Sequence, residues 1–319
     1  MAVYTRVDDS QLEKFLTAYD VGTAVNFKGI AEGVENSNYF LDTQDNRYIL
    51  TLYEKRVNIS DLPFFLSLMD HFADLGLPSA RPIRARDGEI LQELCGRTAA
   101  LIAFVPGLSR NIPSIEDCST MGAMLARAHK AALSFPMSRE NDLSLAGWQK
   151  LATRCQRADE CKTGLTSTIN DEITYLTKHW PDGKNLRSGV IHADFFPDNV
   201  LFSNNGEISG LIDFYFSCND FFVYDLAICL NAWCFDANHT FQSDKANAFI
   251  ASYQSHTSLT KEEIEILPLM LRGAAIRFLL TRTYDWLNKV EGALVTVKDP
   301  TEYYKKLAFH QQNPDAIKL

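Results

Sequence analysis

The chain has 319 residues, of which 46% are hydrophobic and 22% are charged, a composition that is ordinary for a globular protein and too apolar for a disordered one. Its 31 basic and 40 acidic residues give a formal net charge of −9, which argues against a general basic face for nucleic acid. Because one hydrophobic core tends to stop growing at about 250–300 residues, we expect two lobes.

Seven cysteines are spaced irregularly and without a C-x-x-C pair, which favours free thiols in a reducing compartment over disulfides or a zinc site. Residues 1–13 contain three acidic side chains and no apolar core of a signal peptide. No window reaches the roughly 18 uninterrupted apolar residues that span a bilayer. We therefore expect a cytoplasmic protein that makes no membrane contact.

The first hundred residues are typical of a mostly antiparallel sheet with helices packed on it. Ser10 and Glu13 form a capping-box pattern that predicts a helix, and Gly22 can end it. A second helix is expected from about 60 to 76. Alternating apolar residues predict strands at 25–30, 39–41 and 48–53, and short strands beside 87–88 and 96–97.

After Pro106 and Gly107 the pattern changes to helices, with short strands only within 188–213. The fold class is therefore α+β, with a small β-rich N-lobe over 1–105 and a larger, mainly helical C-lobe over 106–319. Helices are expected at 114–130, 145–157, 165–179, 221–235, 241–255, 262–288 and 300–310.

One segment carries the chemistry: His192, Asp194 and Asn199 in the spacing H-x-D-x-x-x-x-N, with Asp213 fourteen residues after Asn199. Phosphoryl transfer from ATP needs a carboxylate beside the acceptor hydroxyl and metal ions at the phosphates. Mg²⁺ prefers oxygen ligands and usually takes one or two carboxylates. A hairpin between Asn199 and Asp213 can bring these oxygen-bearing side chains together. The competing interpretation is a structural loop with a hydrogen-bonded Asp and a turn Asn.

Segments 192–199 and 212–214 resemble the aminoglycoside phosphotransferase and choline kinase superfamily, which has a protein-kinase-like fold of two lobes. The resemblance covers nearly the whole chain. Finer features are similar to the homoserine kinases of that superfamily, in segments 32–39, 48–54, 61–65, 213–216 and 273–278.

The resemblance implies a role for each residue of the central motif. Asp194 matches the catalytic aspartate, which would orient the hydroxyl of L-homoserine and accept its proton. Asn199 and Asp213 match the ligands of Mg²⁺. His192 matches the loop histidine, which we expect to brace the loop by hydrogen bonds, and Asp225 would steady the same loop.

The resemblance also implies an ATP site in the N-lobe. A loop between the first two strands would cover the nucleotide, and the adenine would hydrogen-bond to the linker between the lobes near 102–108. The matching residues are Gly33, Asn36, Ser37 and Asn38 in the loop and Ala103, Phe104 and Val105 in the linker.

One position departs from the kinase pattern. The third strand usually carries a lysine for the α- and β-phosphates, whereas the matching residue here is Thr51. Thr51 has no charge, so the phosphates would depend on metal alone or on Lys55 reaching inward. The same departure keeps open a nucleotide-binding protein without turnover.

A free amino acid must be held at both ends. Its carboxylate asks for an arginine, and the candidates are Arg277 and Arg282, which lie roughly 140° apart around one predicted helix. Its ammonium asks for a carboxylate, for which Asp198 is the first candidate and Asp220 and Glu35 are alternatives.

The sequence therefore predicts an ATP-dependent phosphotransferase with an alcohol acceptor, which phosphorylates homoserine in threonine biosynthesis. The alternative is a related kinase that acts on choline, a sugar-like compound or an aminoglycoside. A protein kinase is disfavoured because His192 is not followed by an Arg-Asp pair. The sequence does not indicate an oligomeric state.

Overall fold

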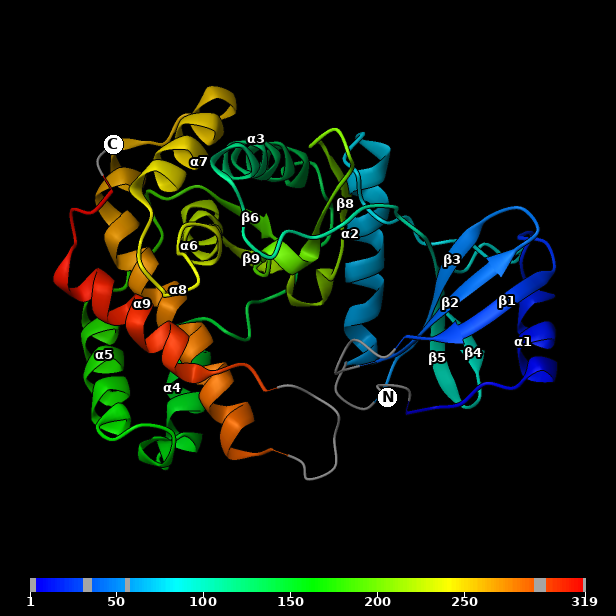
Figure 1. Cartoon of the computed structure of the whole chain (residues 1–319), viewed down its shortest axis with the longest axis horizontal. Helices are drawn as coiled ribbons and strands as arrows, with labels where there is room; N and C mark the ends of the chain where they lie inside the picture. Colours follow the sequence, from blue (N-terminus) through cyan, green and yellow to red (C-terminus); the bar gives the residue numbers. More distant parts are fainter. Residues whose placement is uncertain (1–3, 31–35, 55–57, 290–296, 318–319) are drawn as a thin grey trace. The chain divides into compact units, whose positions relative to one another are not determined.

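The computed structural model describes residues 4–30, 36–54, 58–289 and 297–317, and these residues form an α+β fold (Figure 1). The described chain divides into two compact units. Unit 1 comprises residues 4–107 and 209–215, and unit 2 comprises residues 108–208, 216–289 and 297–317. The predicted functions of the two lobes stay predictions.

Unit 1 contains a five-stranded antiparallel sheet with the order β1-β2-β3-β5-β4. Its elements are α1 (Asp9–Leu16), β1 (Ala24–Gly29), β2 (Ser37–Thr43), β3 (Arg47–Leu52), α2 (Leu62–Asp74), β4 (Gln92–Leu94) and β5 (Arg97–Ala103). Both predicted helices and most of the predicted strands are present, but the strand expected before 87–88 is absent among the described residues, where only isolated bridges at Ser79 and Pro82 occur. The capping box was misplaced, because Asp8 and Gln11 form it and Ser10 lies inside the first turn.

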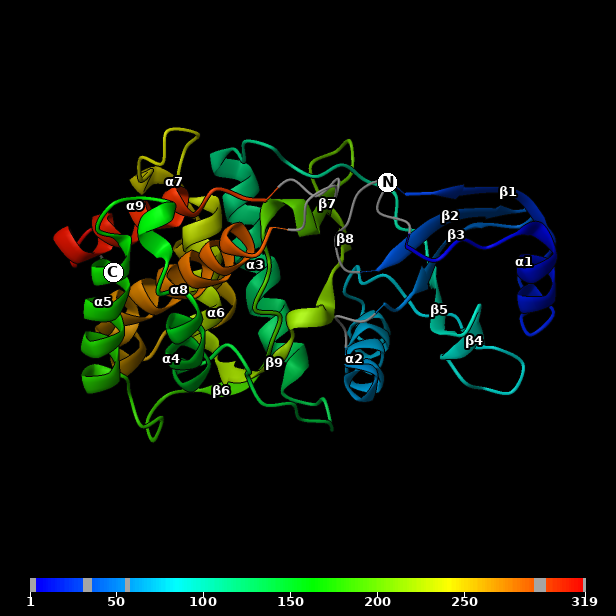
Figure 2. The same cartoon turned by 90° about the horizontal axis from the view of Figure 1, so that it is seen from below.

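The two faces of this sheet carry different residues, as the two-residue period of strands requires. One face packs against α1, which Figure 2 shows lying against the sheet, and its core includes Leu41, Leu50 and Leu101. The opposite face carries Phe40 and Ile49, which are paired across β2 and β3 and are only half-buried. This second face is therefore less completely buried than the face that packs against α1.

Unit 2 is mainly helical; one of its central helices is a nearly continuous run of buried residues, and the other is buried throughout 273–280. These are α6 (Phe222–Trp233) and α8 (Lys261–Leu287), and α9 lies along α8 (Figure 1). The predicted helices are all present, with ends that differ by a few residues. The others are α3 (Ile115–Ala132), α4 (Leu145–Arg154), α5 (Leu165–His179), α7 (Ser243–His256) and α9 (Pro300–Gln312).

Four short strands surround the predicted chemical motif. β6 (Ser188–Ile191) pairs antiparallel with β9 (Cys218–Phe221), and β7 (Val200–Phe202) pairs with β8 (Ile208–Leu211). The segment 192–199 is thus the connection between β6 and β7. The predicted hairpin is confirmed, and its second strand carries the chain from unit 2 into unit 1.

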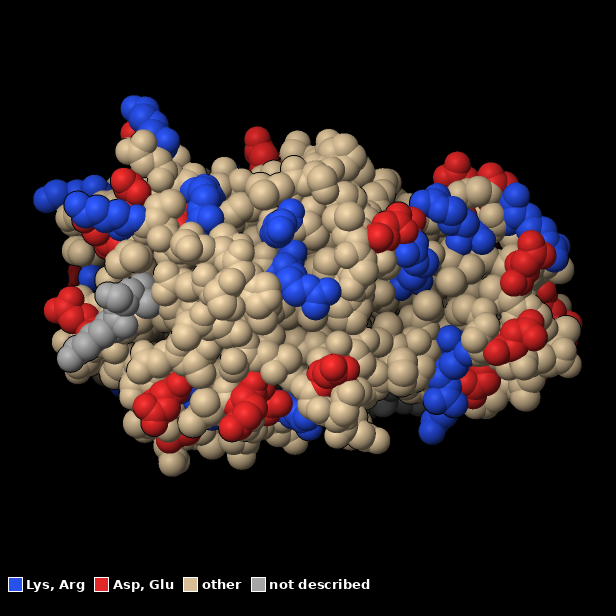
Figure 3. Space-filling view, turned by 90° about the horizontal axis from the view of Figure 1, so that it is seen from above, with Lys and Arg blue, Asp and Glu red and all other residues tan. Residues whose placement is uncertain are grey.

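The distribution of surface charges and the state of the cysteines agree with what the composition indicates. In the view of Figure 3, basic and acidic side chains are interspersed and neither sign forms a broad field. All seven cysteines are free, and burial raises the pKa of the Cys155 and Cys218 thiols to about 12. Among the described residues, no helix combines the length and the apolarity that a membrane span requires.

Candidate active site

The loop that follows β6 has an unusual backbone immediately before Asp194. Ala193 has a φ of 64°, in the left-handed region that disfavours residues with a Cβ. The His192 ring stacks on the Phe195 ring at a centroid distance of 3.7 Å, and its Nδ1 accepts from the N–H of Asp194 at 3.3 Å. A 3₁₀ turn at Pro197–Asn199 then leads into β7. The loop conformation must therefore be held from outside.

Asp225 of α6 holds the N–H groups at the start of this loop. Its two carboxylate oxygens accept from the N–H of His192 at 3.1 Å and of Ala193 at 2.9 Å. The side chain is fully buried, and His129 of α3 lies 3.2 Å from it and 3.0 Å from the Tyr253 hydroxyl. These hydrogen bonds agree with the steadying role expected of Asp225.

Three further side chains hold the carbonyl groups of the loop. Arg277 of α8 donates from Nη1 to the carbonyl of Ala193, and the Trp233 indole donates to the carbonyl of Phe195 at 2.7 Å. Asn199 donates from Nδ2 to the carbonyl of Asp194 at 2.8 Å. Buried carbonyl groups are rarely left without a donor, and here helices α6 and α8 supply most of the donors.

The Asp194 carboxylate is partly exposed and is oriented by Asn199, whose Nδ2 also donates to Oδ2 at 3.0 Å. With its nitrogen directed at Asp194, Asn199 can offer Oδ1 to a cation. Among the described residues, no group of three or more His, Cys, Asp or Glu side chains is placed to hold a metal ion. The predicted Mg²⁺ ligands, Asn199 and Asp213, are not such a group, because one of them is an amide.

Asp213 follows β8 and belongs to unit 1, whereas Asp194 and Asn199 belong to unit 2. Its side chain is exposed, and its backbone is left-handed with a φ of 63°. Two residues later, the Tyr215 hydroxyl lies 3.0 Å from the Tyr53 hydroxyl. The convergence of Asp213 with the other two residues stays a prediction.

Three of the predicted nucleotide-covering residues, Asn36, Ser37 and Asn38, lie at or directly before the start of β2. The Ser37 hydroxyl is buried, donates to Glu54 at 2.8 Å and accepts from two backbone N–H groups near the N-terminus. Asn38 accepts a hydrogen bond from the Thr51 hydroxyl at 2.8 Å, and Asn36 accepts one from the Glu54 N–H at 3.3 Å. Gly33 lies outside the described residues, as do Glu35 and Lys55.

The predicted adenine linker follows directly from β5. The N–H of Ala103 donates to the carbonyl of Arg81 at 2.8 Å, and the N–H of Phe104 donates to the carbonyl of Arg47 at 3.1 Å. Ala103, Phe104 and Val105 are each half-buried. The Phe104 ring lies 6.0 Å from the Phe40 ring, on the face of the sheet opposite α1. The role of this linker in binding adenine stays a prediction.

Comparison with known proteins decides the family. Residues 26–259 match the model of a phosphotransferase enzyme family. Curated homoserine kinases are similar over nearly the whole chain: that of Methylobacterium radiotolerans is 51% identical, covering 99% of this chain and 98% of the relative. That of Bradyrhizobium sp. is 53% identical, covering 98% and 96%. The chain belongs to the homoserine kinases of this phosphotransferase family.

Solved structures show which fold this homoserine kinase family member has. An amicoumacin kinase in complex with AMP-PNP and Ca²⁺ is 14% identical with a TM-score of 0.69, over 98% of this chain and 96% of that one. A choline kinase from Streptococcus pneumoniae is 16% identical with a TM-score of 0.64, over 94% and 98%. The expected kinase-like α+β fold of the aminoglycoside phosphotransferase and choline kinase superfamily is confirmed.

Among the residues predicted to hold the ends of homoserine, Arg277, Arg282 and Asp198 each have a partner inside the protein. Arg277 donates to the carbonyl of Ala193, as described above. Arg282 is buried and forms an ion pair with Glu302 of α9 at 2.5 Å. Asp198 is exposed and lies 3.1 Å from Lys298. Each prediction of substrate binding therefore competes with an observed internal contact.

The Glu302 side chain belongs to a buried ionic network between α8 and α9. Despite desolvation, Lys306 and Arg282 lower the pKa of Glu302 to about 2. Lys306 donates to Glu302 at 2.6 Å and to the carbonyl of Asn231 at 2.8 Å. Burial lowers the pKa of His310 to about 3, and its Nε2 lies 2.6 Å from the Asn231 side-chain oxygen. This network fixes α9 to the buried part of unit 2.

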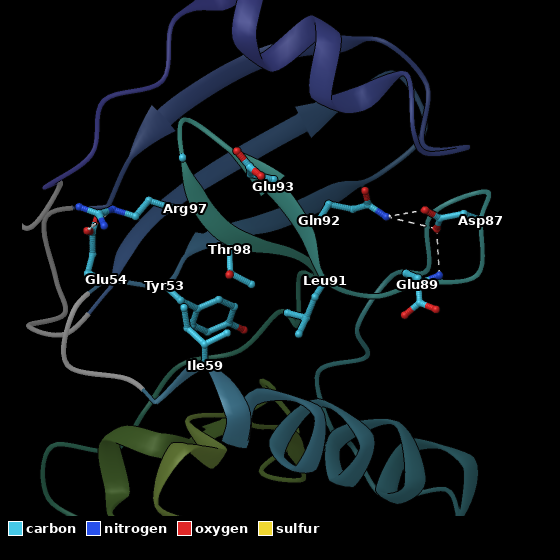
Figure 4. Close-up of a pocket in the computed structure, with 11 residues that line it drawn as sticks. Tyr53, Glu54, Ile59, Asp87, Glu89, Leu91, Gln92, Glu93, Arg97 and Thr98 are labelled. Atoms are coloured by element: carbon cyan, nitrogen blue, oxygen red, sulfur yellow. Dashed lines mark hydrogen bonds and ion pairs between the residues drawn. The ribbon is translucent and has the colours of Figure 1, made fainter.

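A pocket of about 790 Å³ lies in unit 1, between strands β4 and β5 and the start of α2 (Figure 4). Glu54 and Arg97 form an ion pair of 3.1 Å at one end, and the described site residues do not line the pocket. The lining residues are Tyr53, Glu54, Ile59, Asp87, Glu89, Leu91, Gln92, Glu93, Gly96, Arg97 and Thr98.

Sequence reasoning missed His129 and Trp233 in this homoserine kinase family member. Both act on the loop 192–199, but His129 lies 96 residues from Asp225 and Trp233 lies 38 residues from Phe195. A buried Trp or His in an amphipathic helix looks like an ordinary core residue in the sequence. Only the packing of α3 and α6 against β6 reveals their part in the site.

Proposed function

We propose that this chain is an ATP-dependent homoserine kinase that transfers the γ-phosphate of ATP to the hydroxyl of L-homoserine in threonine biosynthesis, in the cytoplasm. The observation that carries the proposal is about 50% identity to curated homoserine kinases over nearly the full chain. The loop 192–199 supports it, because its backbone is held so that one partly exposed carboxylate, that of Asp194, can meet a hydroxyl group.

The transfer requires little covalent help from the protein. The homoserine hydroxyl oxygen bonds to the γ-phosphorus while the bond between that phosphorus and the β,γ-bridging oxygen breaks, so ADP leaves. Asp194 accepts the hydroxyl proton, and the hydrogen bond from Asn199 keeps its carboxylate oriented. The products are phosphohomoserine and ADP.

The donor set of this chain fits Mg²⁺. Asn199 presents an amide oxygen and Asp213 an exposed carboxylate, and such hard oxygen ligands suit Mg²⁺, which usually takes one or two carboxylates. Bound Mg²⁺ would neutralise charge on the β- and γ-phosphates. In this proposal Asn199 and Asp213 hold the metal, and Asp194 remains available for the acceptor hydroxyl.

We assign ATP to the face of the unit 1 sheet that α1 does not cover. Phe40, Ile49 and Phe104 provide apolar surface for the adenine there, beside the linker. Asn38 and Thr51 lie on the same face, linked by a hydrogen bond. Lys28 pairs with Phe40 in the register and is exposed, so it can supply the positive charge that Thr51 lacks.

The two ends of homoserine have candidate partners in Arg277, Arg282 and Asp198. Arg282 is the weaker candidate for the carboxylate, because its charge is already compensated by Glu302. Asp198 is exposed and its pair with Lys298 can open at low cost, so it is available to the ammonium group. Arg277 is the remaining arginine candidate, and its contacts suggest another role.

One assay tests the proposed function. ADP release from the purified protein with ATP and Mg²⁺ is measured against homoserine, choline, serine and an aminoglycoside. We expect kcat/KM for homoserine to exceed that for every other acceptor by at least about 100-fold, because a site that pairs polar groups rejects analogues that leave them unpaired. Equal or higher turnover with another acceptor contradicts the proposal.

A further inference from the structure

Arg277 differs from the other largely buried arginines of unit 2. Arg139, Arg272 and Arg282 each form an ion pair with a carboxylate at 2.5 to 2.6 Å. Arg277 is only 2% exposed, yet among the described residues it makes no such pair and donates instead to the carbonyl of Ala193. Its Nε has no hydrogen-bond partner within the same set of residues.

Arg277 is buried without a direct ion pair among the described residues, although its charge acts on Asp220, where burial raises the pKa of the carboxyl and the charge of Arg277 opposes that rise. Taking a charge out of water costs several kcal/mol, and an ion pair is the usual compensation. The guanidinium lies 4.5 Å from the Phe278 ring centroid and 5.6 Å from that of Phe216, contacts that return only part of this cost. A methionine of similar length would pack here without a buried charge, but it could not donate to a carbonyl.

The contact with Ala193 is placed where it can control Asp194. The N–H of Ala193 donates to Asp225 and its carbonyl accepts from Arg277, so both polar groups of this left-handed residue are held. The carbonyl of Ala193 belongs to the peptide that joins it to Asp194. Because a peptide is planar, fixing this carbonyl fixes the direction in which the chain enters Asp194.

Near Arg277, helix α8 packs closely against a neighbouring side chain. Gly273 lies one turn before Arg277, and a Cβ placed on it would come within 2.4 Å of the Trp180 ring. The absence of a side chain at Gly273 therefore lets the tryptophan pack directly on α8. This contact fixes the position from which Arg277 reaches the loop.

We propose that Arg277 is a positioning residue, which holds the Ala193–Asp194 peptide so that the Asp194 carboxylate faces the acceptor hydroxyl, and that it does not bind the substrate carboxylate. The proposal rests on the proposed function, in which Asp194 accepts the hydroxyl proton. It makes kinetic predictions that a carboxylate-binding arginine would not share.

The test compares R277M and R277K with R272M, a matched change of an arginine on the same helix. We expect R277M to lower kcat at saturating homoserine about 10- to 100-fold while KM for homoserine stays within about threefold, with R277K intermediate. The same loss should appear with 3-aminopropan-1-ol, which lacks the carboxylate. R272M breaks the pair with Glu172, so it should lower the thermal midpoint and keep kcat.

Hydrogen exchange supplies a readout that does not depend on turnover. We expect the amides of 192–196 to exchange about tenfold faster in R277M than in the wild type, and at an unchanged rate in R272M. A large rise in KM for homoserine with kcat retained, and no loss with 3-aminopropan-1-ol, overturns the proposal in favour of carboxylate binding. Unchanged exchange in both Arg277 variants overturns it as well. Failure of the wild type to phosphorylate homoserine contradicts the proposed function instead.

Discussion

The two predicted halves of the site are held in different ways. In unit 2, the loop around Asp194 is held by Asp225, Trp233 and Arg277, which lie 32, 38 and 84 residues from their partners. In unit 1, the start of β2 is held mainly by side chains that are nearer in the sequence: Ser37 and Asn38 bond to side chains 17 and 13 positions away. Ser37 also accepts from the N–H groups of Tyr4 and Thr5, which lie 33 and 32 positions away.

This difference implies a division of work. Strand pairing fixes the side chains of a sheet relative to one another. The proposed nucleotide face needs only this, because it has to offer a flat apolar surface with polar groups at its edge. The acceptor carboxylate needs an accuracy well below 1 Å, because small displacements of a reacting group reduce rate greatly. In unit 2, buried polar side chains from several helices therefore hydrogen-bond to a single loop.

The largest expected effect comes from D194N, which tests whether the acceptor carboxylate of unit 2 acts separately from nucleotide binding in unit 1. The amide cannot accept the hydroxyl proton, so turnover should fall about 10²- to 10⁴-fold. ATP affinity, measured by calorimetry, should stay within about twofold if unit 1 binds the nucleotide. A loss of ATP affinity comparable to the loss of turnover contradicts the division between the units.

Next in size is W233F, which removes the indole donor to the buried carbonyl of Phe195 and leaves it only the weak donor of the Cys229 thiol at 3.9 Å. An unsatisfied buried group costs about 1–3 kcal/mol, so the free energy of unfolding should fall by that amount and kcat about tenfold. W148F is the matched control, because the Trp148 side chain is fully buried but its Nε1 has no hydrogen-bond partner among the described residues. Equal kinetic losses in the two variants show that the indole hydrogen bond is irrelevant.

We expect the free energy of unfolding of unit 2 to fall at acid pH because of His310. Its pKa of about 3 lies below the unfolded value of about 6.5, so the unfolded chain binds more protons between these values. The stability is therefore complete above about pH 6.5 and falls by about 2 kcal/mol as the pH drops to about 5. Denaturation followed by tryptophan fluorescence reports this, because Trp148, Trp180, Trp233 and Trp286 all lie in unit 2. H310Q should flatten this dependence, and an unchanged slope contradicts the assignment.

The smallest effect is expected from K28M, which tests the charge of the unit 1 face. Losing one exposed cation near the phosphates should raise KM for ATP about two- to fivefold, equivalent to roughly 1 kcal/mol or less, without changing kcat. K14M, on α1, is the control and should leave KM unchanged. If K28M has no effect, the phosphates are neutralised by metal or by residues outside the described chain.

Local patterns could be predicted from the sequence because their physical causes are local. The strands of unit 1, the helices of unit 2 and the hairpin between Asn199 and Asp213 follow from periodicity and turn residues. The capping box was misplaced by two residues because Asp8 with Gln11 and Ser10 with Glu13 both fit the pattern. The contacts of Arg277 and Trp233 depend on how whole helices pack, and periodicity does not contain that information.

Because residues 209–215 belong to unit 1, that unit cannot be completed early in the synthesis of this chain on the ribosome. The N–H of Leu211 donates to the carbonyl of Pro78 at 2.7 Å, and the fully buried Phe214 ring packs against Phe72 at 5.8 Å. A ribosome that has released only the first 107 residues has not yet supplied these partners. The nascent sheet must therefore wait about a hundred codons with part of α2 uncovered, a period in which chaperones have an apolar surface to protect.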